Sequence, residues 1–330
     1  MAYAGQMQGK LRLFILIWLC WLTGGSGRTG QMPIPPHDIS VALEPIKLFP
    51  QQPDVRRTGA LLFLQGYALH ARADDFGGWS AMLAQPGGLR FISDAGAMFD
   101  LPYPKGSSVM GQLRELAKGC GLHWNKEEQD AEAATWDPRS RTWWVTLERL
   151  NQICRVNAQG RVTHIAPRAM ADWLSPLGAE ALLRLTDGRF LIFAESNPGR
   201  PGAPSPVLLY DRDPLDPAAQ LQRLSFRPPT GFRPVDAAQL PDGRILLLLR
   251  GFRLPLHWRT RLVVIQLHQL RAGAMLSGQE IARLEPPMIT DDFEALAVTQ
   301  EKRRTIIWLA SDDNFWPFQQ SYLLKFALED

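Results

Sequence analysis

Three carboxylates stand directly before an apolar run near the end of the chain. Asp291, Asp292 and Glu294 precede Ala295–Val298, which has the composition of a buried strand. A buried charge without a partner is unfavourable, so these side chains must face water, a basic group or a cation. Carboxylates gathered in this way can bind a hard metal ion or act as general acids and bases.

The same arrangement recurs along the chain. Five segments open with a polar residue and a short strand of small and apolar residues, turn, and return in an apolar strand. The opening residues are Ser80, Glu132, Glu180, Asp236 and Glu294. Consecutive openings are 52, 48, 56 and 58 residues apart. A period near 50 residues with several strands per repeat is typical of β-propeller blades.

We therefore predict an all-β fold with a single β-propeller. The stretches 59–71 and 321–328 are expected to pair, so that strands from the two ends of the chain close the ring. This predicts six blades, with five as the alternative, and a β-sandwich of similar hairpins is the competing fold. A short helix is expected at 112–118, on a loop between blades.

The propeller hypothesis places the opening residues around a central channel. Following each hairpin to its far end gives a second set of residues at equivalent places. This second set is Asp94, Glu148, Glu195, Arg250 and Asp312. Because a hairpin returns to the level where it began, both sets are expected at one mouth of the channel, in a wet pocket.

Crowded carboxylates repel one another unless positive charge lies among them. Ca²⁺ is the candidate cation, because it accepts several oxygen ligands from carboxylates, carbonyls and water. The predicted metal ligands are Glu132, Glu180, Asp236 and Asp312. The alternative is a solvated vestibule without metal, in which the carboxylates pair with arginines.

Catalytic and substrate-binding candidates lie at the same mouth. Glu294 and Asp313 are the candidate general bases. Arg250 could offset the negative charge, Asn314 adds an oxygen donor, and Trp316 could form a wall of a ligand pocket. These three are the predicted substrate-binding residues. The sequence has no HExxH zinc motif, glycine-rich phosphate loop or CxxC pair.

The N-terminus has the pattern of an export signal. Lys10 and Arg12 precede the apolar run 13–22, and small residues follow at 23–27. Ten apolar residues are fewer than the roughly 20 that span a bilayer, although an uncleaved anchor is the alternative. We predict a signal peptide at 1–27, a Pro-rich lead-in at 28–58 and the propeller at 59–330, with no membrane span after cleavage. The expected location is periplasmic or secreted.

Charge and cysteine content restrict the function further. The net charge of +3, without a block of Lys or Arg, gives no reason to expect nucleic-acid binding. Cleavage would remove two basic residues and leave 34 basic and 33 acidic side chains. Cys120 and Cys154 could form a disulfide in an oxidising compartment or remain separate thiols.

Several of these segments resemble a family of bacterial phytase-like proteins described as having "esterase-like activity of phytase". The resemblance runs from about 59 to 328. It is carried above all by DDFEALAV (291–298) and LASDDNF (309–315), and more loosely by GGWSAM (77–82), FISDAG (91–96), DAEAA (130–134), FAES (193–196) and LLRGF (248–252). It implies an exported β-propeller and hydrolysis of an ester or phosphoester. The chain departs from the family pattern at Ala95, where the family tends to have Arg, and this removes a cation that could bind an anionic substrate.

The hypothesis with most support is a monomeric, metal-dependent hydrolase that acts on a small ester or phosphoester at an acidic channel mouth. One alternative is a binding module that holds a small molecule at the same mouth without turnover. Another is a scaffold in the cell envelope, because fold alone does not determine activity.

Overall fold

Antiparallel strands make up most of the molecule. The computed structural model describes residues 34–117, 120, 130–173, 178–195, 203–253 and 257–329. Within these ranges there are two short 3₁₀ helices, Arg168–Met170 and Leu267–Gln269, and no α-helix. None of the described residues forms a helix that could cross a membrane. The predicted signal peptide at 1–27 lies outside the described residues.

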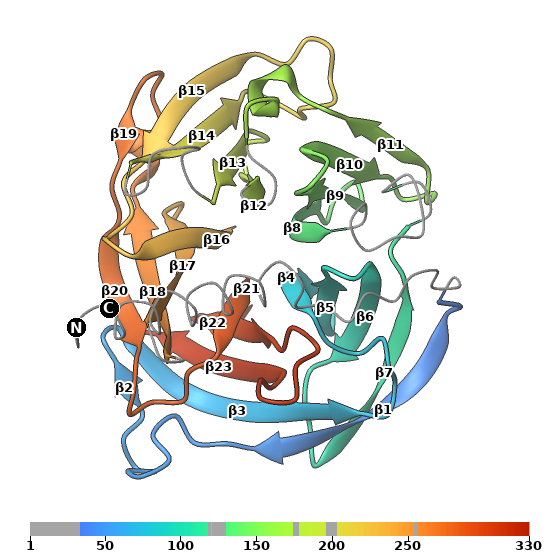
Figure 1. Cartoon of the computed structure of the whole chain (residues 1–330), viewed down its shortest axis with the longest axis vertical. Helices are drawn as coiled ribbons and strands as arrows, with labels where there is room; N and C mark the ends of the chain where they lie inside the picture. Colours follow the sequence, from blue (N-terminus) through green and yellow to red (C-terminus); the bar gives the residue numbers. More distant parts are fainter. Residues whose placement is uncertain are drawn as a thin grey trace, which may run out of the picture.

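The strands fall into five groups, each with four antiparallel strands (Figure 1). The first group holds β4 (Trp79–Gln85), β5 (Gly88–Ser93), β6 (Ala97–Pro102) and β7 (Ser108–Glu115). The second holds β8 (Ala131–Asp137), β9 (Thr142–Leu147), β10 (Gln152–Val156) and β11 (Val162–Ile165). The third holds β12 (Ala179–Arg184), β13 (Phe190–Ala194), β14 (Ser205–Tyr210) and β15 (Leu221–Phe226), with β19 (Met275–Leu276) parallel to β15.

The remaining two groups follow the same plan. The fourth holds β16 (Phe232–Gln239), β17 (Ile245–Arg253), β18 (His257–Ile265) and β20 (Gln279–Leu284). The fifth holds β21 (Asp292–Glu301), β22 (Arg304–Asp312), β23 (Tyr322–Leu328) and β3 (Leu61–Ala71). Figure 1 shows the groups arranged around a centre, with the first strand of each group innermost. These strands contact one another in the cyclic order β4, β8, β12, β16, β21, which is a propeller-like, all-β arrangement.

The two ends of the chain meet in one sheet. Strand β23 pairs with β3, as expected for 321–328 and 59–71, and together they extend the β21–β22 hairpin. Strand β1 (His37–Pro45), inside the Pro-rich lead-in, pairs with β3 on one side and β7 on the other. Strand β2 (Arg57–Thr58) also pairs with β3. The first and fifth groups are thereby joined into a single 10-stranded sheet.

The helix predicted at 112–118 is wrong for the residues that the structure describes there. Residues Ser108–Glu115 form β7, in which Gly111 and Leu113 are buried and Gln112 between them is exposed. This alternation has the period of a strand. The pairing of β7 with β6 and with β1 outweighs the weak helical preference of the segment.

Apolar side chains fill the space between neighbouring groups. Five buried clusters each draw residues mainly from two adjacent groups. On β17, Leu247 packs toward the third group and Leu248 packs toward the fifth. Both faces of β17 are therefore buried, which explains why return strands such as β17 have unbroken runs of apolar residues. Cys120 and Cys154 form a disulfide, with a Cα–Cα distance of 5.6 Å.

Candidate metal and ligand site at the axis

Each innermost strand carries a β-bulge at the same place. The strand pairing skips one residue in every group. The skipped residues are Ser80, Glu132, Glu180, Val235 and Glu294. A bulge leaves its extra residue outside the ladder and re-aims its side chain. The repeated bulges thus set three carboxylates and one hydroxyl at equivalent places around the axis.

The bulge register explains the different environment of Asp236. Val235 occupies the bulge in the fourth group, and Asp236 is the next residue along β16. Its carboxylate accepts backbone hydrogen bonds from Ala237 at 2.7 Å and from Leu296 at 2.7 Å. Burial raises the pKa of Asp236 well above its usual range, although these two donors oppose the rise. The structure therefore places Asp236 as a link between β16 and β21, apart from the other predicted ligands.

The second predicted set lies at equivalent positions. In each hairpin, the residue before the bulge pairs with a residue on the second strand. The member of the second set is the residue that comes after this partner along the chain. These return positions are Asp94, Glu148, Glu195, Arg250 and Asp312. All four acids among them are buried. They are more enclosed than the wet pocket expected from the sequence.

A third set stands two residues before each bulge. It consists of Gly78, Asp130, Gly178, Arg233 and Asp292. In three groups the backbone carbonyl at this position accepts a hydrogen bond from the return position, as Asp130 does from Glu148 at 2.9 Å. Sequence reasoning did not place Asp130 and Arg233 as charged members of the site. An offset of two residues from the opening residue Glu132 would have found Asp130, but the same offset from Asp236 gives Pro234, because the bulge of the fourth group lies at Val235.

We call the charged members of these three sets the axial cluster. It comprises Asp94, Asp130, Glu132, Glu148, Glu180, Glu195, Arg233, Arg250, Asp292, Glu294 and Asp312. Nine carboxylates thus stand with two arginines. The two arginines are not spread evenly around the axis, and this divides the cluster into two halves.

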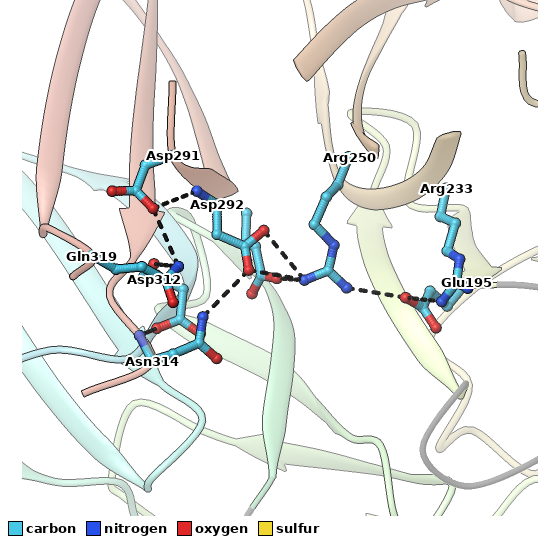
Figure 2. A network of polar contacts seen from close by, with 9 residues as sticks. Glu195, Arg233, Arg250, Asp291, Asp292, Asp312, Asn314 and Gln319 are labelled. Atoms are coloured by element: carbon cyan, nitrogen blue, oxygen red, sulfur yellow. Dashed lines mark hydrogen bonds and ion pairs between the residues drawn. The ribbon is translucent and has the colours of Figure 1, made fainter. Parts of the chain in front are cut away.

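One half is organised by Arg250 (Figure 2). Its guanidinium donates to Glu195 Oε1 at 3.0 Å and to Asp292 Oδ2 at 3.3 Å, and it also contacts Glu294. Arg233 donates to the same Glu195 oxygen at 2.9 Å. Burial works against the charge of Arg250, but the surrounding carboxylates outweigh it and raise the pKa of Arg250 above its usual range. Burial also raises the pKa of Asp292 to about 6, although Arg250 lowers it in part.

The other half of the axial cluster is centred on Glu148 and shares Glu195 with the first half. Oxygens of Glu148, Glu180 and Glu195 lie within 4.8 Å of one another, and so do oxygens of Asp130, Glu132 and Glu148. Arg149 pairs with Asp130 at 2.5 Å. Within the described part of the chain, no basic side chain forms an ion pair with Glu132, Glu148 or Glu180.

Protonation of this second half is strongly perturbed. Burial raises the pKa of Glu148 to about 7, and neighbouring acids add to the rise. Burial and the neighbouring carboxylates hold the pKa values of Glu132 and Glu180 well above the usual range. Like charges this close need shared protons or a cation. The donors are buried carboxylate oxygens, which suit a hard divalent cation, so these clusters could hold a metal ion.

The predicted metal ligands are therefore divided. Glu132 and Glu180 lie in the two carboxylate groups, whereas Asp236 and Asp312 lie outside them. The Asp312 carboxylate accepts the backbone N–H of Asn314 at 2.6 Å. Burial and the nearby Asp94 and Asp292 raise its pKa well above the usual range. Glu148, which the sequence places only among the return positions, belongs to both carboxylate groups.

Both candidate bases already have ion-pair or hydrogen-bond partners in the structure. Glu294 contacts Arg250. Asp313 accepts hydrogen bonds from the N–H groups of Gly78 at 3.0 Å and Phe315 at 3.1 Å, and from Ser321 Oγ at 2.7 Å. These bonds fix the loop that follows β22.

The predicted substrate-binding residues lie near one another on different elements. Arg250 is inside the axial cluster, and the Asn314 amide donates to Asp292 Oδ2 at 3.3 Å (Figure 2). Trp316 lies two residues further along the same loop and is exposed. Ser80, at the bulge of the first group, is buried, and its hydroxyl has no hydrogen-bond partner within the described part of the chain.

The fold and this site define a propeller-like, all-β protein with a buried acidic centre. A family model described as "Phytase-like: Esterase-like activity of phytase" matches residues 74–315, which is most of the chain. The chain therefore belongs to this phytase-like family. The match confirms the resemblance carried by the motifs, over slightly narrower limits than 59–328.

Solved structures resemble the chain more distantly. Virginiamycin B lyase from Staphylococcus aureus is 9% identical, over 87% of this chain and 99% of that one, with a TM-score of 0.40. Endo-arabinase from Bacteroides thetaiotaomicron is 10% identical, over 78% and 96%, with a TM-score of 0.43. A protein of unknown function from Dyadobacter fermentans is 12% identical, over 92% and 99%, with a TM-score of 0.45. Likeness at this level carries no function across. No curated protein sequence matches the chain significantly.

Proposed function

We propose that this chain is an exported, five-bladed propeller that binds a divalent cation, Ca²⁺ first among them, and hydrolyses an ester or phosphoester at its axial cluster. The observation that carries the proposal is the pair of overlapping carboxylate groups centred on Glu148. Of the three acids there, Glu148 and Glu180 are buried and Glu132 is half-buried, and none of them forms an ion pair with an arginine among the described residues. The phytase-like family supports hydrolysis as the class of reaction.

The two halves of the cluster would have different tasks. Glu148 and Glu180, with Glu132 beside them, would hold the cation, which would polarise a carbonyl or phosphoryl oxygen of the substrate. Arg250 would hold Glu195, Asp292 and Glu294 in fixed positions through its ion pairs with them. Glu294 is the proposed acceptor of the proton from the attacking water. The three hydrogen bonds of Asp313 favour a positioning role for that residue.

Export and domain limits form part of the same proposal. The signal peptide at 1–27 would be removed, the lead-in at 28–58 would contribute β1 to the sheet, and 59–330 would form the propeller, as a monomer in the periplasm or outside the cell. The Cys120–Cys154 disulfide supports this location, because disulfides persist in oxidising compartments. The expected partner is a small molecule at the axis.

Hydrolysis can be tested with two chromogenic substrates, 4-nitrophenyl acetate and 4-nitrophenyl phosphate. We expect Ca²⁺-dependent turnover of at least one, lost on chelation and reduced at least about 100-fold in Glu180→Gln, as removal of a transition-state contact would do. Glu44→Gln is the matched control, because Glu44 is exposed and its ion pair among the described residues is with the exposed His70. Equal activity in Glu180→Gln and Glu44→Gln would contradict the proposal.

A binding module without turnover is the second candidate. It is favoured by the engagement of both candidate bases, since Glu294 contacts Arg250 and Asp313 is held by three donors. Stabilisation by a small ligand, without turnover of either substrate, would support this function over hydrolysis.

A further inference from the structure

Exposed aromatic side chains are concentrated in one loop. The exposed large apolar side chains among the described residues are Val55, Met110, Met275, Phe315, Trp316 and Phe318. Three of these six fall within four consecutive residues, and Phe318 is 88% exposed. Single exposed apolar residues are ordinary, but a contiguous group marks a contact surface. We call residues 314–318 the aromatic loop.

The loop is held in a defined shape. Asn314 and Phe315 have φ angles of +48° and +51°, a conformation that is uncommon for a bulky side chain. Asp313 accepts the N–H of Phe315, and Asp291 accepts hydrogen bonds from the Gln319 side chain at 3.2 Å and the Gln320 N–H at 3.0 Å. Both ends of the aromatic loop are therefore fixed by carboxylates, and its exposed rings are presented by a built turn.

The loop lies beside the axial cluster. Asn314 donates to Asp292, a cluster member of the fifth group. The Phe315 ring packs on Gly78 of the first group, where an added Cβ would stand 2.6 Å from its Cε2 atom. Gly78 is two residues before the bulge at Ser80. The aromatic loop thus bridges two neighbouring groups at the end of the axis where the carboxylates gather.

We propose that the aromatic loop is a stacking platform for an aromatic ring carried by the ligand of the axial cluster, and that this ligand is uncharged or cationic. This inference deepens the proposed function and rests on it for the identity of the reaction. Aromatic faces attract apolar rings and cations. The single charge of Arg250 is shared among Glu195, Asp292 and Glu294, so the carboxylates on this side of the axial cluster outnumber it and repel an anionic ligand.

The same charges argue against a membrane as the occupant. A bilayer with anionic headgroups would meet the acidic end of the axis as the aromatic side chains approached. A small ring-bearing ester satisfies both features, because its ring covers the loop while its ester group reaches the cluster.

A matched pair of esters tests the platform in the Ca²⁺-loaded protein. Methyl 4-phenylbutanoate and methyl hexanoate have the same ester group, but only the first carries a ring. We expect the ring-bearing ester to have a KM about fivefold lower at similar kcat, as one aromatic stacking contact would give. Trp316→Ala combined with Phe318→Ala removes this preference. Met110→Ala, at an exposed position outside the loop, retains it.

Binding of the matched N-methyl amides separates this inference from the hydrolase proposal. If neither ester is cleaved, but the ring-bearing amide binds the wild type more tightly than the hexanamide and loses this preference in the double variant, the hydrolase proposal fails and the platform stands. Equal binding of the two amides, or an unchanged preference in the double variant, overturns the platform. Tighter binding of 4-phenylbutanoate than of its amide to the Ca²⁺-free protein overturns the charge preference. Sedimentation with phosphatidylcholine vesicles that depends on Trp316 would also overturn the inference, in favour of membrane contact.

Discussion

Glu148 and Glu180 bring carboxylate oxygens within 4.8 Å of each other from neighbouring strand groups, and both side chains are buried. Glu148 also accepts the N–H of Gly178 at 2.9 Å, which holds it beside the bulge of the third group. The return end of one hairpin and the bulge of the next thus meet at the axis. This pair is the centre of the proposed cation site, and its proton affinity leads to the first prediction.

Stability of the Ca²⁺-free protein should fall as pH rises through neutrality. The pKa of Glu148 is about 7 in the folded chain against an ordinary value of 4.5, so the folded state binds more protons than the unfolded state between these values. The stabilisation is complete below about pH 4.5 and is lost as pH rises through about 7. We expect a higher Tm at pH 5.5 than at pH 8 after chelation, measured by calorimetry.

Saturating Ca²⁺ should weaken or reverse this trend, because a cation binds the ionised carboxylates. Glu148→Gln should reduce the pH dependence of the chelated protein. A chelated wild type whose Tm increases between pH 5.5 and pH 8 would contradict the assignment of raised pKa values to this half of the cluster.

Arg250→Met should be strongly destabilising. It would leave the buried carboxylates of Glu195, Asp292 and Glu294 without their shared cation, and breaking a buried ion pair in this way typically costs about 3–5 kcal/mol. Urea denaturation at pH 7 measures the loss. Arg244→Met removes a more exposed pair with Asp242 and should cost less than about 1 kcal/mol. Similar losses in the two variants would show that Arg250 does not hold the cluster together.

Asp236→Asn should lower stability but not Ca²⁺ affinity, whereas Glu180→Gln should lower Ca²⁺ affinity but not stability. The Asp236 carboxylate accepts two backbone N–H groups, so the amide would leave one of them poorly paired and cost about 1–3 kcal/mol. Its Ca²⁺ affinity should be unchanged. Glu180→Gln replaces a carboxyl group whose charged form is already disfavoured by burial and by neighbouring acids, so Ca²⁺ affinity should fall without loss of stability in the metal-free protein. Calorimetric titration and urea denaturation distinguish the two outcomes, and loss of Ca²⁺ binding in Asp236→Asn would restore that residue as a ligand.

Reduction of the disulfide should lower the stability of the wild type. Cys120 and Cys154 are 34 residues apart, and the loop-closure model gives about 3–4 kcal/mol for a loop of this length. Denaturation with and without dithiothreitol measures the difference. The Cys120→Ala/Cys154→Ala variant should be indifferent to the reductant, and an equal response of the variant would mean that the effect does not come from this bond.

Much of the fold could be predicted because each repeat has the same order of polar, small and apolar residues. The apolar return strands, such as Ile245–Leu249, are buried on both faces, so the sequence shows them as unbroken runs. The pairing of 59–71 with 321–328 followed from their strand character. Strand β1 was missed, because it lies in a Pro-rich stretch and its role depends on pairing with both β3 and β7.

The site could be predicted only in part. The return positions could be predicted because the second strand of a hairpin ends beside the start of the first. Glu148, Glu195 and Arg250 do lie at equivalent positions in their groups. Asp236 was aligned by its charge with the other opening residues, whereas the bulge that sets the register in the fourth group lies at Val235. A one-residue shift changes which way a strand residue points. The division of the axial cluster into two halves depends on which carboxylates Arg250 contacts in neighbouring groups. The sequence does not show these contacts.

The most direct test of the proposed cation site is the metal content of the purified mature protein, with its Tm recorded before and after chelation. Our account predicts at least one tightly bound Ca²⁺ per chain, a Tm lowered by chelator and restored by Ca²⁺, and loss of this response in Glu148→Gln/Glu180→Gln but not in Glu44→Gln. No bound metal and no change of Tm on adding Ca²⁺ to the wild type would contradict it, and the axial cluster would then be a protonated carboxylate network without a cation.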